Sequence, residues 1–394
     1  MFLAANDAND ANGRLKNLLM RPFASLASFA AAILCLLVVT SASGQAPQIQ
    51  RPQLAEEAFK DIQILRGIPV DEFMDTMGFI SASLSLNCTD CHGPGAASSW
   101  ASYADNTPLK QTARRMMRMV AALNKDSFAG ARAVTCFTCH AGSRTPKVVP
   151  SLAIQYSAPV EDPNEVEVRE QKPVDPILDK YIQAIGGAQR LAALTSFTGK
   201  GTYAGYDTDH QKVPVDIFAK APDQYAMIVH GVGATNGDSI RAFDGRAGWI
   251  GSPDKPVPLI MLTGGNLEGA RLDAMLAFPV RIKRMFNQWR TGSTTIDDND
   301  VVVLQGTNPR QAPVKLYFDS KSGLLVRQVR YSDSPIGMVP TQIDYADYRD
   351  VAGVRIPFKW TVTWTDNQTS IQLTAVQPNV SIDAARFGPP AQTR

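Results

Sequence analysis

Most residues of this chain that could carry chemistry lie in two Cys-x-x-Cys-His strings. The chain has 394 residues but only five cysteines and four histidines, and the strings "CTDCH" (88–92) and "CFTCH" (136–140) contain four of the cysteines and two of the histidines. Two thiols three residues apart can each form a thioether with one porphyrin, and the imidazole that follows can bind its iron. We therefore predict two covalently bound haem c groups. The predicted attachment sites are Cys88, Cys91, Cys136 and Cys139.

The histidines separate this interpretation from three other uses of paired cysteines. Structural zinc sites, disulfides and thioredoxin-like dithiols all employ Cys-x-x-Cys, but none of them explains a histidine directly after both pairs. No βαβ pattern surrounds the pairs either, as a thioredoxin-like motif would require. In the haem interpretation His92 and His140 are the proximal ligands of the two irons.

Methionines precede each string on a segment with a helical pattern. Residues 71–84 ("DEFMDTMGFISASL") contain Met74 and Met77, and residues 111–126 ("QTARRMMRMVAALNKD") contain three more, at 116, 117 and 119. Methionine in an amphipathic helix commonly packs in a core, but a thioether is also a distal ligand of haem iron in cytochromes c. Because each cluster lies shortly before a haem string, we expect one thioether from each cluster to reach an iron.

Two further features concern the same region. The segment "EEAFKDIQILRGIP" (56–69) predicts another helix, ending at Gly67 and Pro69. Arginines at 114, 115 and 118 could pair with haem propionates or could form a solvated helix face.

The N-terminus has the pattern of an export signal. Basic residues precede an apolar stretch at 23–39, and the small residues "TSASGQA" follow it. We expect a signal peptide over residues 1–46 that directs the chain to the periplasm, with an uncleaved membrane anchor as the alternative. Cys35 lies inside the apolar stretch. The net charge of +2 gives no indication of nucleic-acid binding.

The strings "GIPVDEFMDTMGFISASLSLNCTDCH" (67–92) and "TARRMMRMVAALN" (112–124), with "VTCFTCHAG" (134–142) after them, resemble the photosynthetic reaction-centre cytochrome c subunit family. The resemblance covers residues 51–147 and implies a repeated unit of helix, turn and haem string. It implies that Met77 is the distal ligand of the first haem. It implies Met116 for the second, with Met119 as the alternative. The tetrahaem members of the family have two further strings that this sequence lacks, so the resemblance is to a dihaem first half.

The sequence changes character after the second string. Residues 148–172 are rich in Pro and Glu and are typical of a linker, and one or two short helices are predicted around Gly186–Gly187. Alternating strand patterns follow from about residue 196, and they predict about nine antiparallel strands with a helical segment at 266–289 between them. This order, with the hairpin "DSKSGLLVRQ" (319–328), weakly resembles the lipoprotein-carrier-like half-barrel fold. That fold encloses an apolar cavity that can hold a lipid chain.

The sequence thus predicts a multidomain protein. An all-α dihaem module (47–147) is followed by the linker and by an α+β domain (173–394) with a large curved antiparallel sheet. The predicted function is single-electron transfer, without enzymatic activity, to redox partners such as a membrane-bound reaction centre or respiratory complex. The sheet domain would dock a partner or hold a lipid. The alternatives are a haem peroxidase-like enzyme with one open iron site, and a lipid- or partner-binding protein with accessory haems.

Overall fold

The computed structural model describes residues 51–390, apart from 156, 158–161, 167, 169–172, 234–236 and 253. The described residues belong to one compact unit that begins at Arg51. The predicted signal peptide, with Cys35, lies outside the described residues. Within the described part of the chain, none of the helices is both long enough and apolar enough to span a bilayer.

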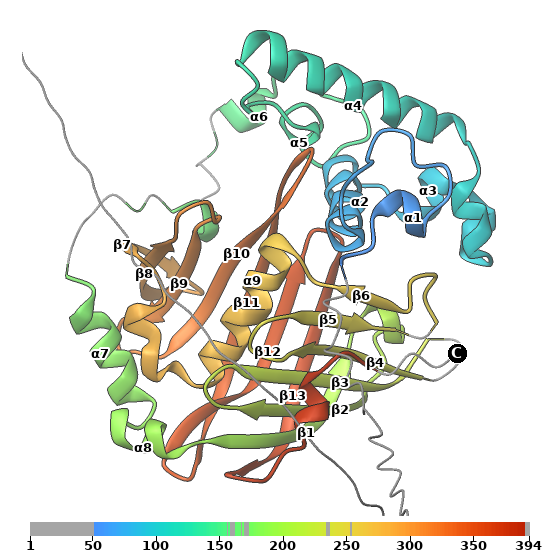
Figure 1. Ribbon diagram of the computed structural model, residues 1–394. Coiled ribbons are helices and arrows are strands. Elements are labelled where there is room, and N and C mark those ends of the chain that lie inside the picture. The colour runs from blue at the N-terminus through green and yellow to red at the C-terminus, as the bar shows by residue number, and fades with distance from the viewer. Residues whose placement is uncertain are drawn as a thin grey trace, which may run out of the picture. The chain divides into compact units, whose positions relative to one another are not determined.

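The N-terminal part of the unit is helical (Figure 1). Its α-helices are α1 (Ala55–Ala58), α2 (Val70–Leu84), α3 (Cys88–His92), α4 (Pro108–Ser127) and α5 (Cys136–His140). Helix α4 begins three residues before the predicted pattern, because Thr107 accepts a hydrogen bond from the backbone N–H of Lys110 and proline occupies the first helical position. Helix α2 ends at Leu84, and its C-cap residue, Ser85, adopts a left-handed conformation with φ of 54°. The helices predicted to carry the methionines are therefore present.

The helix predicted over residues 56–69 is wrong except for its first turn. The chain leaves the helical conformation after Ala58, and Asp61 has a φ of 62°. The carboxylate of Glu56 accepts hydrogen bonds from the backbone N–H of Gly67, at 3.1 and 2.9 Å, and so closes the segment into a loop. Contacts of Asp61 with α4, described below, hold this loop, and local sequence does not encode them.

Short helices connect the N-terminal part to the sheet. They are α6 (Leu152–Gln155), α7 (Asp175–Ala184) and α8 (Ala188–Ala193). Of the one or two helices predicted around Gly186–Gly187, the structure has two, α7 and α8, on either side of these glycines. A Cβ atom at Gly186 would lie 2.2 Å from the carbonyl oxygen of Gly353, and its φ is +124°, so this position requires glycine.

The described residues of the C-terminal part form one antiparallel sheet of thirteen strands together with helix α9 (Gly264–Ala277). The strands are β1 (Ser196–Ala204), β2 (Val213–Lys220), β3 (Gln224–Val232), β4 (Gly237–Phe243), β5 (Gly248–Gly251), β6 (Leu259–Met261), β7 (Gln288–Ile296), β8 (Asn299–Thr307), β9 (Val314–Asp319), β10 (Leu325–Ser334), β11 (Gly337–Val351), β12 (Val354–Trp364) and β13 (Asn367–Pro378). Their order is β6-β5-β4-β3-β2-β1-β13-β12-β11-β10-β9-β8-β7, so all adjacent strands are consecutive in sequence except β1 and β13, and β6 and β7 form the two edges.

The sheet has more strands than the nine or so that the sequence predicts. Single predicted segments divide into two strands at tight turns, as at Ala352–Gly353 between β11 and β12. Strand β7 is not predicted from the sequence, because its first residues continue the amphipathic helical pattern of the segment 266–289. The predicted hairpin turn at residues 321–323 is confirmed, since the N–H of Gly323 donates to the carbonyl of Asp319 at 2.8 Å and Gly323 has a φ of 76°.

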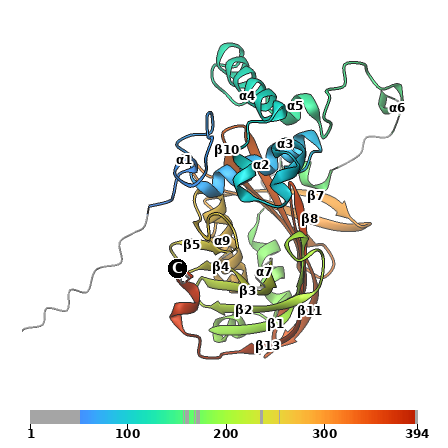
Figure 2. The ribbon, with the colours of Figure 1, turned by 90° about the vertical axis from the view of Figure 1, so that its right-hand side faces the viewer.

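Helix α9 (Gly264–Ala277) connects the two edge strands, β6 and β7, and the sheet curves around it (Figure 2). Glycines four residues apart, Gly265 and Gly269, bring its backbone close to β10. A Cβ atom at these positions would lie 2.5 Å from Ser332 Cα and 2.6 Å from Arg330 Nε. The fold class predicted from the sequence, an N-terminal helical region and an α+β region with a large antiparallel sheet, is confirmed.

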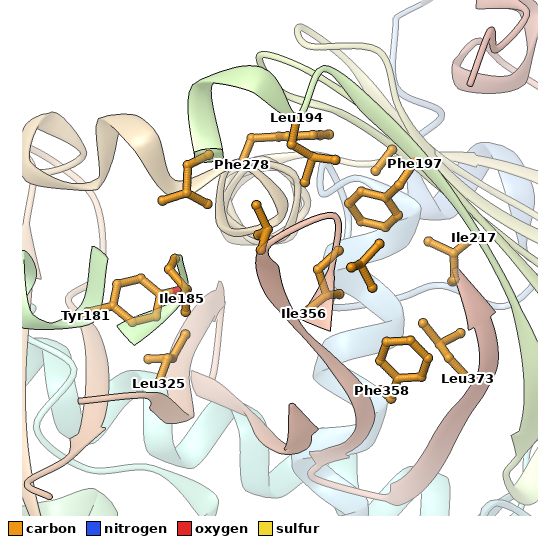
Figure 3. Packing of buried hydrophobic residues seen from close by; sticks show 14 of the residues in the cluster. Tyr181, Ile185, Leu194, Phe197, Ile217, Phe278, Leu325, Ile356, Phe358 and Leu373 are labelled. Carbon is orange, nitrogen blue, oxygen red and sulfur yellow. The ribbon is translucent and has the colours of Figure 1, made fainter. Parts of the chain in front are cut away.

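The main hydrophobic core lies between the sheet and the helices α7, α8 and α9 (Figure 3). Side chains from distant strands meet there, among them Phe197 of β1, Ile217 of β2 and Leu373 of β13. Tyr181 of α7 packs against Phe318 of β9 with ring centroids 5.2 Å apart. This apolar burial is the dominant stabilising contribution to the sheet region.

Candidate functional site

Each Cys-x-x-Cys-His string forms a five-residue helix with a side-chain cap. Asn87 Oδ1 accepts from the N–H of Asp90 at 3.0 Å before α3, and Thr135 Oγ1 accepts from the N–H of Thr138 at 3.3 Å before α5. The two cysteines of each string occupy the first and fourth positions of their helix, so both thiols lie on one face. The strings therefore present paired thiols in a locally determined geometry.

Both histidines hold the tautomer that a metal ligand requires. His92 Nδ1 lies 2.9 Å from the carbonyl oxygen of Tyr103, and His140 Nδ1 lies 3.0 Å from that of Ser143. A carbonyl oxygen only accepts hydrogen bonds, so Nδ1 carries the proton and Nε2 keeps its lone pair for a metal. The Tyr103 ring also packs on the His92 imidazole, at 4.7 Å between centroids. Burial lowers the pKa of His92 and so favours the neutral, ligating form.

The thiols do not have the character of a redox pair or a zinc site. Cys88, Cys91, Cys136 and Cys139 are not joined in disulfides. Burial raises the pKa of the thiols of Cys88, Cys91 and Cys136, whereas reactive dithiols require a lowered one. Across the described residues, no three His, Cys, Asp or Glu side chains are grouped to hold a metal ion.

The methionines of the two helices differ in their surroundings. Met117 of α4 packs with Phe79 and two residues of the sheet region, so its role is packing. Met74 and Met119 are each 50% exposed, and Met77 and Met116 are partly buried. The assignment of Met77 and Met116 as distal ligands stays a prediction, with Met74 and Met119 as the competing thioethers.

Each Cys-x-x-Cys-His string contacts the long helix that precedes the other string. Helix α2 packs on α5, and α3 packs on α4. The N–H of Gly142, just after the second string, donates to the carbonyl of Ser83 in α2 at 3.1 Å. The hydroxyl of Thr107, which caps α4, donates to the carbonyl of Cys91 in the first string. These crossed contacts join the two repeats into one structure.

The residues around the strings fit a large apolar group. Nine of the twelve exposed large hydrophobic side chains in the described part of the chain lie between residues 74 and 152. They include Trp100, Leu123 and Phe137. Only six buried hydrophobic residues lie between 51 and 147, all small or medium in size apart from Phe79. A region this poor in core residues needs an additional apolar component, and paired thiols with a ligating imidazole are the donor set of haem c.

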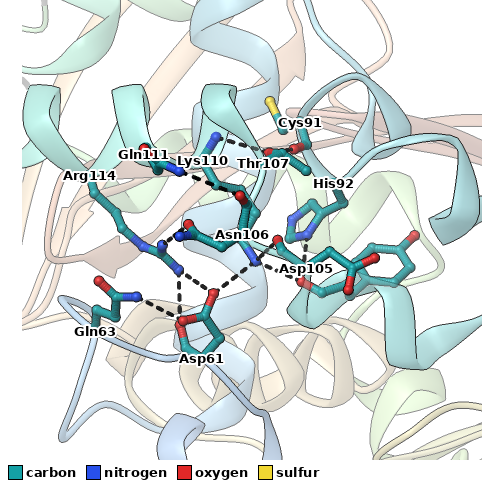
Figure 4. Close-up of polar contacts among 11 residues, drawn as sticks. Asp61, Gln63, Cys91, His92, Asp105, Asn106, Thr107, Lys110, Gln111 and Arg114 are labelled. Atoms are coloured by element: carbon teal, nitrogen blue, oxygen red, sulfur yellow. Dashed lines mark hydrogen bonds and ion pairs between the residues drawn. The ribbon is translucent and has the colours of Figure 1, made fainter.

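A network of charged groups, not foreseen from the sequence, supports the first string (Figure 4). Asp61 accepts from Arg114 Nη2 at 2.7 Å and from Lys110 Nζ at 3.2 Å. The hydrogen bond from Arg114 is the largest of the effects that lower the pKa of Asp61 to about 2. Lys110 Nζ also donates, at 2.9 Å, to the Tyr103 carbonyl that holds His92. Arg114 is thus buried in an ion pair and is not part of a solvated helix face. Its pairing with a haem propionate stays a prediction.

Helix α2 is anchored to the sheet region through its first turns. Asp71 is 5% exposed, and its carboxylate accepts from the N–H and the hydroxyl of Thr263, at 2.6 and 2.8 Å. Asp75, one turn later, accepts from Asn266 Nδ2 at 2.7 Å and from Ser332 Oγ at 2.6 Å. Burial raises the pKa of both carboxyl groups. The helix that bears Met77 is therefore held by α9 and β10.

Comparison with known proteins supports the interpretation of the helical part. Residues 37–172 match the photosynthetic reaction centre cytochrome C subunit family. A reaction center cytochrome c subunit from Thermochromatium tepidum is 37% identical over 97 residues, which are 24% of this chain and 23% of that protein. One from Roseobacter denitrificans is 30% identical over 104 residues, 25% of this chain and 28% of that protein. The chain thus spans about a quarter of the length of these curated relatives. The family resemblance predicted from the sequence is confirmed for this part.

Solved structures are similar to about half of the chain. A LolA superfamily protein from Nitrosomonas europaea is 14% identical, with a TM-score of 0.37, and covers 55% of this chain and 98% of its own. A DUF1329 family protein from Desulfovibrio piger, at 11% identity and a TM-score of 0.39, has the same coverage. These neighbours agree with the lipoprotein-carrier-like resemblance predicted from the sequence. Their TM-scores lie below 0.5, so the description of the sheet rests on its strand pairing.

Proposed function

We propose that this chain is an exported dihaem c-type cytochrome that transfers single electrons. The observation that carries the proposal is the hydrogen bond of each string's histidine to a backbone carbonyl, which leaves Nε2 available as an iron ligand in both strings. The match of residues 37–172 to a cytochrome c subunit family supports it. The haem number, the ligands and the export are parts of the proposal.

Each residue of the two sites has a distinct role in this proposal. Cys88 and Cys91 would attach the first haem, and the second pair of cysteines, at 136 and 139, the other. His92 and His140 would hold the irons from one side, oriented by the carbonyl contacts. A haem iron with histidine and methionine ligands passes single electrons and has no open position for a substrate. The protein supplies attachment, orientation and a partly apolar environment.

The partners and the location follow from the same reasoning. A carrier of this type would work in the periplasm with redox proteins, among them a membrane-bound reaction centre or respiratory complex. The sheet region would dock a partner or hold a lipid. The predicted boundaries, at residues 46, 147 and 172, belong to the proposal as well.

A haem count tests the proposal directly. The full chain is produced in a host that attaches haem c, and the pyridine haemochrome is measured per chain. We expect two covalent haems in the wild type and one in each of the double variants Cys88→Ser/Cys91→Ser and Cys136→Ser/Cys139→Ser. A wild-type chain with a single haem or none would contradict the proposal.

A second experiment tests the methionine ligands. Met77→Leu should abolish the Met-to-iron charge-transfer band of one haem and lower its reduction potential, whereas the matched control Met74→Leu should leave both unchanged. Met116→Leu and Met119→Leu form the corresponding pair for the second haem. If a wild-type haem is high-spin, its methionine does not ligate. The peroxidase-like alternative then becomes the better explanation.

A further inference from the structure

The sheet region contains a cavity of about 210 Å³ between the sheet and the helices that cover it. Its lining is mostly aromatic and aliphatic and includes Phe197, Ile217 and Leu373, which Figure 3 shows from close by. Tyr345 and Trp360, paired across β11 and β12, form another part of the wall. An engineered apolar cavity of about 150 Å³ binds benzene. This cavity therefore has room for an organic ligand somewhat larger than one aromatic ring.

One part of the wall is charged. Arg330 and Asp273 line the cavity and form an ion pair of 2.5 Å between Nη1 and Oδ1. Gln328 Nε2 donates to the same carboxylate oxygen at 2.9 Å. Asp273 and Arg330 therefore compensate each other, as buried charges must.

A second arginine in the cavity has unused hydrogen-bond donors. Arg241 of β4 lines the cavity directly opposite Met227 of β3, which also lines it. Its guanidinium makes no hydrogen bond or ion pair with any residue that the structure describes. Burial, followed by repulsion from Arg330, lowers the pKa of the Arg241 guanidinium, while the carboxylates of Asp273 and Asp75 attract it electrostatically. Arginine remains protonated in proteins, so the cavity wall carries a cationic group whose N–H donors are not used by the described residues.

Two tyrosines line the same cavity, and Tyr225 interacts electrostatically with Arg241. Tyr225 lies two residues from Met227 on β3, so its side chain is on the same face of the sheet as that of Arg241. Tyr345 lies on β11, in the other half of the strand order, and also lines the cavity. Among the described residues, neither phenolic hydroxyl has a hydrogen-bond partner, and burial raises the pKa of both groups. Both hydroxyls thus stay protonated and can donate. A guanidinium and two hydroxyl donors in an otherwise apolar cavity are complementary to an anion with an apolar body.

We propose that the cavity binds a small carboxylate amphiphile, with the carboxylate on Arg241 and the apolar body against the aromatic wall. The site supplies one charge-assisted hydrogen bond, from Arg241, and a mostly apolar wall. A neutral ligand of the same shape would leave the guanidinium unpaired. The site should therefore discriminate by charge as well as by size. This inference does not depend on the haems.

Isothermal titration calorimetry on the delipidated full-length holoprotein tests the proposal. The probes are octanoate, the neutral 1-octanol and the cationic octylamine, with 3-phenylpropanoate to distinguish an acyl chain from an aromatic body. We expect octanoate or 3-phenylpropanoate to bind about 10- to 100-fold more tightly than octanol, as for one charge-assisted hydrogen bond. Octylamine should not bind.

The variant Arg241→Met removes the charge and keeps the volume. It should bind octanol as the wild type does and lose the preference for the carboxylate. Because Arg241 has no partner in the described structure, we expect this variant to fold and to be at least as stable as the wild type. Tyr345→Phe should weaken carboxylate binding by a smaller factor. Equal binding of octanoate and octanol by the wild type, no carboxylate binding, or a preference that survives in Arg241→Met would each overturn the proposal.

Discussion

The ion pair between Asp61 and Arg114 provides the sharpest test of how the helical part is stabilised. The two side chains are 22% and 11% exposed, and they connect the loop before α2 with the middle of α4. Replacing Asp61 by Asn keeps the size of the side chain and removes its charge. It leaves the buried Arg114 with only Asn106 and one backbone carbonyl as acceptors.

The size of the effect follows from the pKa of Asp61. A shift from 3.8 to about 2 corresponds to about 2.5 kcal/mol, because each pKa unit is worth about 1.4 kcal/mol. Partial exposure screens the pair, so we expect a smaller loss of about 1–2 kcal/mol at pH 7. A carboxyl group whose pKa is lowered by folding contributes stability above its unfolded pKa. That contribution is lost as the pH falls through the folded value. The difference between wild type and variant should therefore disappear between about pH 5 and pH 2.

Denaturant unfolding of the holoprotein at several pH values, followed by circular dichroism, measures this difference. The matched control is Asp347→Asn, which breaks an aspartate–arginine pair with Arg349 that is 36% and 48% exposed. Exposed pairs contribute little, so the control should change the free energy of unfolding far less. A variant Asp61→Asn as stable as the wild type at pH 7, or a deficit of the same size at pH 2.5, would refute the reasoning.

Two further predictions concern the contacts of α9. Replacing Asp71 by Ala leaves the N–H of Thr263 without its acceptor at 2.6 Å. We expect a loss of about 2–4 kcal/mol, seen as a lower Tm, and an unchanged Tm would contradict the anchoring role. Replacing Gly269 by Ala places a Cβ atom 2.6 Å from Arg330 Nε. Overpacking should cost about 1–3 kcal/mol despite the better helix propensity of alanine. A denaturation midpoint at or above that of the wild type would show that α9 can move away from β10 without cost.

Local features of the sequence predicted the parts of the site that are local in origin. Each Cys-x-x-Cys-His string lies within five consecutive residues, so both strings could be identified from residue type and spacing alone. Their helical conformation and caps came from the structure. Helices α2 and α4 followed from apolar periodicity between recognisable ends. The loop at 59–69 could not be inferred, because Asp61 is held by Arg114, fifty-three residues away in the chain.

The sheet also has features that local sequence predicts and features that only distant contacts determine. Alternating residues indicated antiparallel strands and the turn at 321–323, but strand β7 was concealed by a helical pattern at its start. Its identity depends on pairing with β8, and not on local preference. The Tyr103 carbonyl that orients His92 is backbone, and backbone groups leave no trace in a residue pattern.

The sequence by itself determined which residues could attach haem, where the chain changes from helices to strands, and which cytochrome family the helical part resembles. Residue type and spacing are sufficient for these because the interactions involved are short in sequence. The tertiary structure decided which charges are paired. Arg114 and Arg330 form ion pairs with aspartates, whereas Arg241 forms no ion pair or hydrogen bond within the described structure and lines a cavity. Identical side chains acquire different roles because burial and partners come from distant elements, and the free energy of a buried charge depends on both.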